Sequence, residues 1–271
     1  MQIKKYQYPD ACDKVTIAFI KKNEPFKGYW EKSENYILGK MKKWIQSCVD
    51  RSTNAVFLDA GCGTGRLLPE LEAYFNSILA IDPDPTQIER AKDLVEEHGF
   101  HDKVAFQAAS IEGLKCKKET FDVILCSHVL QHVTGSSVQP TLQRLAEVLN
   151  PSGLLFITTT HSGRNHDYFV KAYLRGSEAV EEEIGREEFD SLVLNEENIL
   201  PIHFFTMGTI LRLLESSDLE LADFESYHIL CKVPLLDRIV DRDRIVNSLS
   251  FLEDKLGRDM FIVAKKKAKS P

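Results

Sequence analysis

Short apolar runs alternate with amphipathic segments along the chain from Val56 onward. Five runs have the length and composition of strands, namely 56–60, 78–82, 104–108, 121–127 and 154–158. Between them, RLLPELEAYF, PTQIERAKDLVEEHG and TLQRLAEVLNPSG repeat apolar residues at helical spacing. Strands that alternate with helices form a mostly parallel sheet, so the pattern predicts an α/β, Rossmann-like, doubly wound fold.

The alternation stops after Thr160. Residues 176–200 contain nine acidic residues and one arginine without an evident strand pattern, which indicates a helical or loop insertion over the sheet. A helix (TMGTILRLLESSDLEL), a strand (ELADFESYHI) and a last strand (DMFIVAKK), which can pair antiparallel, complete a seven-stranded sheet. We expect an N-terminal helical extension or lid at 1–50, a core at 51–160 and 201–266, an acidic cap at 161–200, and a tail at 267–271.

Composition and net charge limit the classes of partner that the protein can bind. The net charge of −7 disfavours a general nucleic-acid or anionic-membrane surface, although a local basic patch is compatible with it. The six cysteines are scattered without a C-x-x-C pair, which favours reduced thiols over a zinc site. We find no signal-peptide pattern and no run of about 18 apolar residues. These features favour a soluble, cytoplasmic protein, and they leave its oligomeric state, monomer or homodimer, open.

A glycine-rich segment follows the first predicted strand. Gly61, Gly63 and Gly65 stand where that strand passes into a helix, and glycine lets the backbone approach a ligand closely. Asp82 ends the next strand, where a carboxylate can accept hydrogen bonds from both hydroxyls of a ribose. Asp84 is the rival acid, but it lies between two prolines and is better placed to cap the following helix.

These residues carry a family resemblance. VFLDAGCGTGRLL resembles the first motif of the class I S-adenosylmethionine-dependent methyltransferases, and the similarity continues through VAFQAASIEGL, FDVILCSHVLQHV and EVLNPSGLLFITT. It implies S-adenosylmethionine as cofactor and S-adenosylhomocysteine as product. The residues that it implies for cofactor binding are Asp59, Gly61, Gly63, Gly65, Asp82, Ser110 and Ile111. We add Pro83, Ser127 and Tyr29 as further candidates for cofactor binding. Many relatives have an aspartate where this chain has Ala109, so Ser110, Glu112 or the backbone would hold the adenine amino group.

Methyl transfer from a sulfonium requires alignment of the acceptor and exclusion of water more than a catalytic triad. His128 and His132 follow the fourth strand, where ligands of such sheets bind, so they are the candidate general bases. The alternative interpretation of His132 is a purely structural role. Their spacing of four would also suit a metal, but neither a third ligand nor an H-E-x-x-H motif accompanies them, and we predict no metal site.

Further candidates lie outside the motifs. Tyr29 and Trp30 could form part of a lid over the cofactor, or belong to ordinary helix packing. His203, Phe204 or Phe205 could enter the acceptor pocket, with the others in the core. His161 and Arg164 follow the fifth strand and could bind an acidic acceptor, or form a polar loop. The run of glutamates from Glu181 to Glu183 is interpreted as a solvated helix face.

The favoured function is methylation of a small molecule, such as a secondary metabolite or a cofactor precursor, because an insertion over the sheet would enclose a pocket. Methylation of tRNA or a protein would call for an open basic surface, and the insertion is acidic. A nicotinamide-dependent oxidoreductase is disfavoured by the G-x-G-x-G spacing. A non-catalytic S-adenosylmethionine-binding protein is the remaining alternative.

Overall fold

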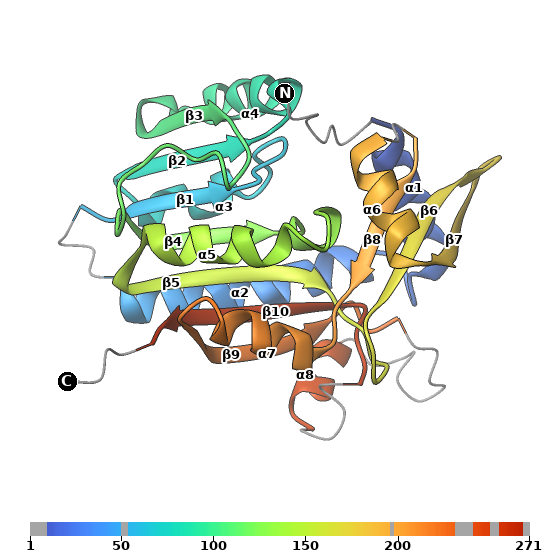
Figure 1. Ribbon diagram of the computed structural model, residues 1–271. Coiled ribbons are helices and arrows are strands. Elements are labelled where there is room, and N and C mark those ends of the chain that lie inside the picture. Colours follow the sequence, from blue (N-terminus) through green and yellow to red (C-terminus); the bar gives the residue numbers. More distant parts are fainter. Residues whose placement is uncertain (1–9, 50–53, 196–197, 231–240, 250–254, 268–271) are drawn as a thin grey trace.

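Seven strands form the central sheet of the computed structural model, in the order β3-β2-β1-β4-β5-β10-β9 (Figure 1). The structure describes residues 10–49, 54–195, 198–230, 241–249 and 255–267. The strands are β1 (Val56–Ala60), β2 (Ser77–Asp82), β3 (Val104–Ala108), β4 (Phe121–Ser127), β5 (Leu149–Thr160), β9 (Leu219–Tyr227) and β10 (Asp259–Lys266). Strand β10 runs antiparallel to both of its neighbours, and the strands from β3 to β5 are mutually parallel. The predicted fold class is confirmed.

Helices cover both faces of this sheet. One apolar cluster joins the sheet to α2 (Tyr29–Cys48), α3 (Leu68–Leu71) and α4 (Pro85–Glu97). The other joins it to α5 (Val138–Val148) and α7 (Met207–Glu215). Because both faces are buried, the central strands are apolar along nearly their whole length, which made them recognisable in the sequence. The short 3-10 helices are η1 (Glu72–Tyr74), η2 (His101–Lys103) and η3 (Leu130–His132).

A second sheet lies beyond the carboxyl ends of β1, β4 and β5 (Figure 1). It has the order β7-β6-β8 and consists of β6 (Tyr168–Arg175), β7 (Glu178–Ile184) and β8 (Leu200–Phe204). Helix α1 (Asp10–Asn23) packs on it, and α6 (Arg186–Asn195) contacts β6 and β8. A last short helix, α8 (Arg242–Asn247), contacts β9.

The predicted helical or loop insertion is therefore wrong in its first part. Residues 168–184 form a β-hairpin, and α6 supplies the helical part. The interpretation of Glu181–Glu183 as a helix face is also wrong, because these residues belong to β7. Alternation places Glu181 and Glu183 on one face of the hairpin and Glu182 on the other, where it pairs with Lys171. Because acidic residues lie on both faces of the hairpin, the sequence does not show the alternation of polar and apolar residues that is typical of a strand.

Smaller differences concern element ends. The helix expected over RLLPELEAYF is reduced to α3 followed by η1. Strand β5 begins earlier than expected, because Leu149 already pairs with Phe121. Residues 268–271 of the predicted tail and residues 1–9 lie outside the described part of the chain. Among the described cysteines, Cys48, Cys62, Cys116 and Cys126 are free thiols. Within the described ranges, no helix is both long and apolar enough to span a bilayer.

Candidate functional site

The glycine loop lies at the point where the strand order reverses, between β1 and β4. Gly61, Gly63 and Gly65 all have positive φ, at 86°, 52° and 76°. A Cβ on Gly61 would collide with Val129, whereas one on Gly63 would meet no heavy atom within 4 Å. Gly61 is therefore required for packing under the segment after β4, and Gly63 borders open space that a ligand can fill.

Asp82 holds this loop in place. Its Oδ2 accepts a hydrogen bond from the Gly63 backbone N–H (3.0 Å), and its Oδ1 accepts one from Asp84 N–H (2.9 Å). Burial raises the pKa of Asp82, and these two backbone bonds oppose that effect. Each carboxylate oxygen retains a further acceptor site for a ligand. Asp84 instead accepts from the Thr86 N–H at 2.8 Å and caps α4, as predicted.

One cavity of about 660 Å³ extends from the glycine loop to the second sheet. We call its two ends the cofactor half and the acceptor half. The cofactor half is lined by Asp59, Gly61, Cys62, Gly63, Thr64, Asp82, Pro83, Gln87, Ser110 and Ser127. The acceptor half is lined by Val15, Thr16, Phe19, Gln131, His132, Val133, Ala172, Ala179, Glu181, Leu200, Ile202, Arg258 and Asp259.

The cofactor half is suited to a cation. Burial, together with the charge of Asp82, raises the pKa of Asp59 to about 7. Two carboxyl groups thus face one small space, and a positively charged ligand would relieve their repulsion. The open position above Gly63 adds backbone that a ligand can approach. These residues fit a cofactor that carries a positive charge and a ribose.

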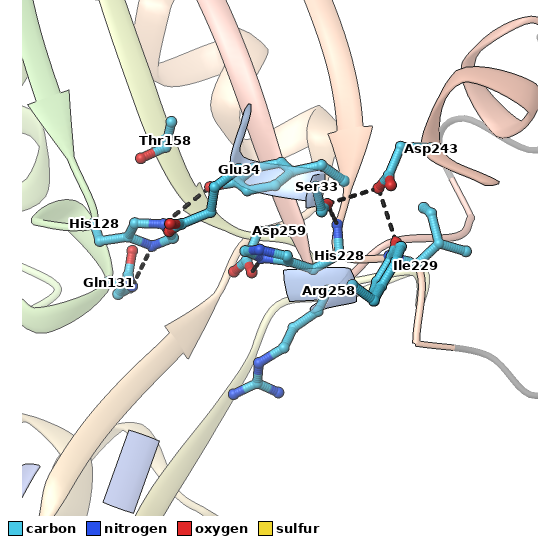
Figure 2. Close-up of polar contacts among 12 residues, drawn as sticks. Ser33, Glu34, His128, Gln131, Thr158, His228, Ile229, Asp243, Arg258 and Asp259 are labelled. Atoms are coloured by element: carbon cyan, nitrogen blue, oxygen red, sulfur yellow. Dashed lines mark hydrogen bonds and ion pairs between the residues drawn. The ribbon is translucent and has the colours of Figure 1, made fainter. Parts of the chain in front are cut away.

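His128 directly follows β4, and its ring contacts side chains from η3 and β9. Its φ of 55° is unusual for a residue other than glycine, and such conformations are concentrated at functional sites. Its Nδ1 lies 3.1 Å from Gln131 Nε2, and its Nε2 lies 2.9 Å from the Tyr227 hydroxyl (Figure 2). Both ring nitrogens are thus engaged by protein groups. Burial lowers the pKa of His128, which keeps the imidazole neutral.

His132 is held differently. Its Nδ1 lies 2.7 Å from the Pro201 carbonyl oxygen, which can only accept, so Nδ1 carries the hydrogen and Nε2 carries the lone pair. Burial lowers the pKa of His132 to about 4. The ring is therefore neutral at physiological pH, in a tautomer fixed by β8.

Further polar groups of the acceptor half come from β7, from the first residue of β10 and from the residue before it. Arg258 Nη2 lies 2.6 Å from Glu181 Oε1, and its guanidinium lies 4.0 Å from the centroid of the Phe19 ring. Asp259 Oδ2 lies 2.6 Å from His228 Nδ1. Figure 2 shows the Arg258 side chain extending away from this pair. The remaining wall is mostly aliphatic.

The N-terminal helix α2 closes over part of the cavity. Trp30 lines it and stacks on His228, with ring centroids 3.6 Å apart. Glu34 makes a two-pronged pair with Arg66, at 2.7 and 3.1 Å, and Arg66 directly follows the glycine loop. The Tyr29 hydroxyl instead donates to Asp243 at 3.0 Å, away from the cavity lining.

Most of the residues predicted from sequence meet at this cavity. The structure brings together Asp59, Gly61, Gly63, Asp82, Pro83, Ser110, Ser127, His128, His132 and Trp30. Gly65 supports the loop from below, against Ala91 and Leu68. Ile111 lies in the apolar core rather than in the cavity wall.

The structure does not bring the remaining predicted substrate residues to the wall. His161 is buried beside Phe224, and Arg164 is exposed and pairs with Glu183. His203 is 3.2 Å from Asp167, and Phe204 stacks on Tyr168. Phe205 belongs to the core. The carboxylate of Asp167 also binds Thr206 and Thr209, so this segment forms a polar network behind β8.

Sequence reasoning missed several polar residues of the cavity, among them Gln131, Glu181, Arg258 and Asp259. Gln131 stands between the two candidate histidines, and its position there was a usable signal. Arg258 immediately precedes a predicted strand, and Asp259 begins it. A charged pair at the start of a strand is too common to indicate a site.

Comparison with known proteins agrees with this geometry. Residues 58–157 match the model of the methyltransferase domain family. A ubiquinone biosynthesis O-methyltransferase of Methylocella silvestris is 35% identical over 102 residues, 38% of either chain. One of Rickettsia bellii (strain OSU 85-389) is 30% identical over 151 residues, which are 56% of this chain and 57% of that protein. The chain thus spans well under two thirds of these relatives.

A solved structure extends the comparison to the whole fold. The 1,6-didemethyltoxoflavin-N1-methyltransferase of Burkholderia thailandensis, with bound S-adenosylhomocysteine, has a TM-score of 0.55 at 17% identity. The match covers 95% of this chain and 89% of that one. Residues 58–157 therefore match a methyltransferase domain, and the fold of the chain agrees with the predicted resemblance to the class I S-adenosylmethionine-dependent methyltransferases. S-adenosylmethionine is the cofactor of this class, which confirms the predicted cofactor.

Proposed function

We propose that this chain is an enzyme that transfers the methyl group of S-adenosylmethionine to a hydroxyl oxygen of a small molecule. The observation that carries the proposal is the continuous cavity, in which His132 lines the wall beyond the glycine loop and an aliphatic wall follows. The acceptor is a cofactor precursor or a secondary metabolite of mainly apolar character. The names of the sequence relatives, which are O-methyltransferases, favour oxygen over nitrogen as the acceptor atom.

The cofactor-binding residues have separable tasks. Asp82 and the backbone around Gly63 hold the ribose and the nearby atoms, and Ser110 lies where the adenine is expected. The Asp59 carboxylate stabilises the positive charge. When bound, S-adenosylmethionine supplies an electrophilic methyl group whose bonding electrons remain on sulfur as the acceptor oxygen takes the carbon.

His132 acts on the acceptor. Its Nε2 takes the proton of the attacking hydroxyl, because the hydrogen on Nδ1 is directed at the Pro201 carbonyl. The low pKa keeps this nitrogen unprotonated before reaction and lets the imidazolium lose its proton to water afterwards. His128 is a positioning residue, because Gln131 and Tyr227 engage both of its nitrogens.

A macromolecular acceptor is less compatible with this site. The acceptor half is enclosed by α1 and the second sheet, and the surface contributed by β7 is acidic. A tRNA backbone would meet repulsion there.

Two measurements test the proposal. Calorimetry should show S-adenosylmethionine binding to the purified chain, and mass spectrometry should show methyl ethers and S-adenosylhomocysteine after incubation with a panel of small phenols. Failure to bind S-adenosylmethionine, or preference for a nicotinamide dinucleotide, would exclude it. Binding without transfer to any member of a broad panel of hydroxyl, amine and thiol acceptors would favour the non-catalytic alternative.

A further inference from the structure

The side-chain carbonyl of Gln131 is unusual among the buried polar groups of the cavity. Gln131 lies in η3, is only 5% exposed and lines the cavity. Its Nε2 reaches His128 Nδ1, but within the described ranges its buried Oε1 has no hydrogen-bond partner. Buried amide oxygens without a donor are rare, and at a cavity wall they indicate a ligand group that completes the bond.

The structure records this amide with its nitrogen toward His128 Nδ1, and an amide nitrogen can only donate. With the hydrogen of His128 on Nε2, the ring donates to the Tyr227 oxygen, and Nδ1 accepts from Gln131 Nε2. Tyr227 is itself buried on β9. Figure 2 shows the contact between Gln131 and His128. In this orientation His128 engages the amide nitrogen, and the carbonyl oxygen is left for the ligand.

Gln131 also lies close to the position of transfer. Val129 packs on Gly61, so η3 continues directly over the glycine loop. Gln131 precedes His132, and both line the same cavity. The wall beyond them is aliphatic, with Val133, Leu200 and Ile202. An acceptor would therefore present its polar edge to residues 131 and 132 and its apolar body to the second sheet.

We propose that Gln131 selects acceptors that carry a second hydrogen-bond donor beside the hydroxyl that is methylated. Gln131 Oε1 accepts the bond from this second donor, a hydroxyl or an N–H group, and so fixes which oxygen faces the methyl group. This inference rests on the proposed function, since it assigns a recognition role within the same site. It narrows the acceptor class to apolar molecules with two neighbouring donors.

Two probes of nearly equal shape separate donor recognition from size. In 2-aminophenol an amino group lies next to the hydroxyl, and in 2-methylphenol a methyl group takes its place. Binding of each to the protein saturated with S-adenosylhomocysteine is measured by ligand-observed NMR titration. We expect the wild-type protein to bind 2-aminophenol about tenfold more tightly, the scale of one hydrogen bond to a buried polar group.

Variants then test the residue. Gln131→Leu should reduce the preference to within about twofold, without changing the affinity for S-adenosylhomocysteine. Gln46→Leu, an exposed glutamine on α2, is the matched control and should keep the preference. Equal binding of the two probes by the wild-type protein, binding of neither, or a preference that survives in Gln131→Leu would overturn the inference.

The methyl-transfer assay with the same probes separates the two proposals. Donor preference in binding without any methyl transfer would support the role of Gln131 and count against the proposed O-methylation. Methyl transfer to both phenols at equal efficiency would support O-methylation and count against the role of Gln131.

Discussion

The two halves of the cavity are built in different ways. The cofactor half comes chiefly from short segments that follow β1, β2 and β4, and its contacts are backbone groups and two carboxyls. The acceptor half combines side chains from α1, η3, all three strands of the second sheet and the start of β10. One half depends on loop geometry that few sequences can supply, and the other depends on side-chain shape that many sequences can supply. Four experiments test this division.

The largest effect is expected in the acceptor half, at His132. In His132→Asn, the asparagine amide can still donate to Pro201, but the basic nitrogen is lost. We expect kcat to fall about 100-fold, the scale of general-base catalysis, with unchanged affinity for S-adenosylmethionine. Because the pKa of His132 is about 4, the wild-type rate should not lose this base until the pH falls well below 6. Full turnover by a folded variant would place the base elsewhere.

In the cofactor half, Asp82→Ala should act on affinity. Loss of the carboxylate removes its hydrogen bonds to the ribose and releases the Gly63 N–H, so binding of S-adenosylmethionine should weaken at least about tenfold, or ~1.5 kcal/mol. Calorimetry measures the change. Asp93→Ala, an exposed position on α4, is the control. Unchanged affinity in Asp82→Ala would refute the assignment of the ribose site.

The charge of Asp59 predicts a pH dependence of cofactor binding. Its pKa of about 7 is raised, so the group loses its proton between about pH 6 and pH 8 in the ligand-free protein. The ionised form attracts a cation, and affinity for S-adenosylmethionine should therefore rise about fivefold over this interval, with proton release. Asp59→Asn should abolish the trend. A flat profile in the wild-type protein would show that Asp59 does not contact the charge.

The smallest effect concerns Trp30, the predicted lid residue. The chain has two tryptophans, and Trp44 bonds to Asp223 outside the cavity lining, so Trp44→Phe isolates the emission of Trp30. Because Trp30 lines the cavity and stacks on His228, ligand binding should change this emission by some tens of per cent. A constant signal, with binding shown by calorimetry, would count against a role in closure.

The same division explains what the sequence could predict. Gly61, Gly63 and Asp82 belong to one short stretch of the chain, from the end of β1 to the end of β2. The backbone requirements of this stretch leave few alternatives, and the structure assembles these residues as expected. The apolar strands were recognisable because both of their faces are buried. The hairpin of β6 and β7 was missed because exposed glutamates occupy both of its faces. Arg258 and Phe19 meet only through the tertiary fold, so nothing local connects them.

The hydrogen bond from His132 to Pro201 links catalytic power to substrate range. The strand that shapes the aliphatic wall also dictates which imidazole nitrogen is basic. Replacing β8 to admit a bulkier acceptor would risk rotating the His132 ring or moving its hydrogen to the other nitrogen. Directed evolution of new specificity in this scaffold should therefore begin in α1 or in the hairpin, and should leave the carbonyl at position 201 where it is.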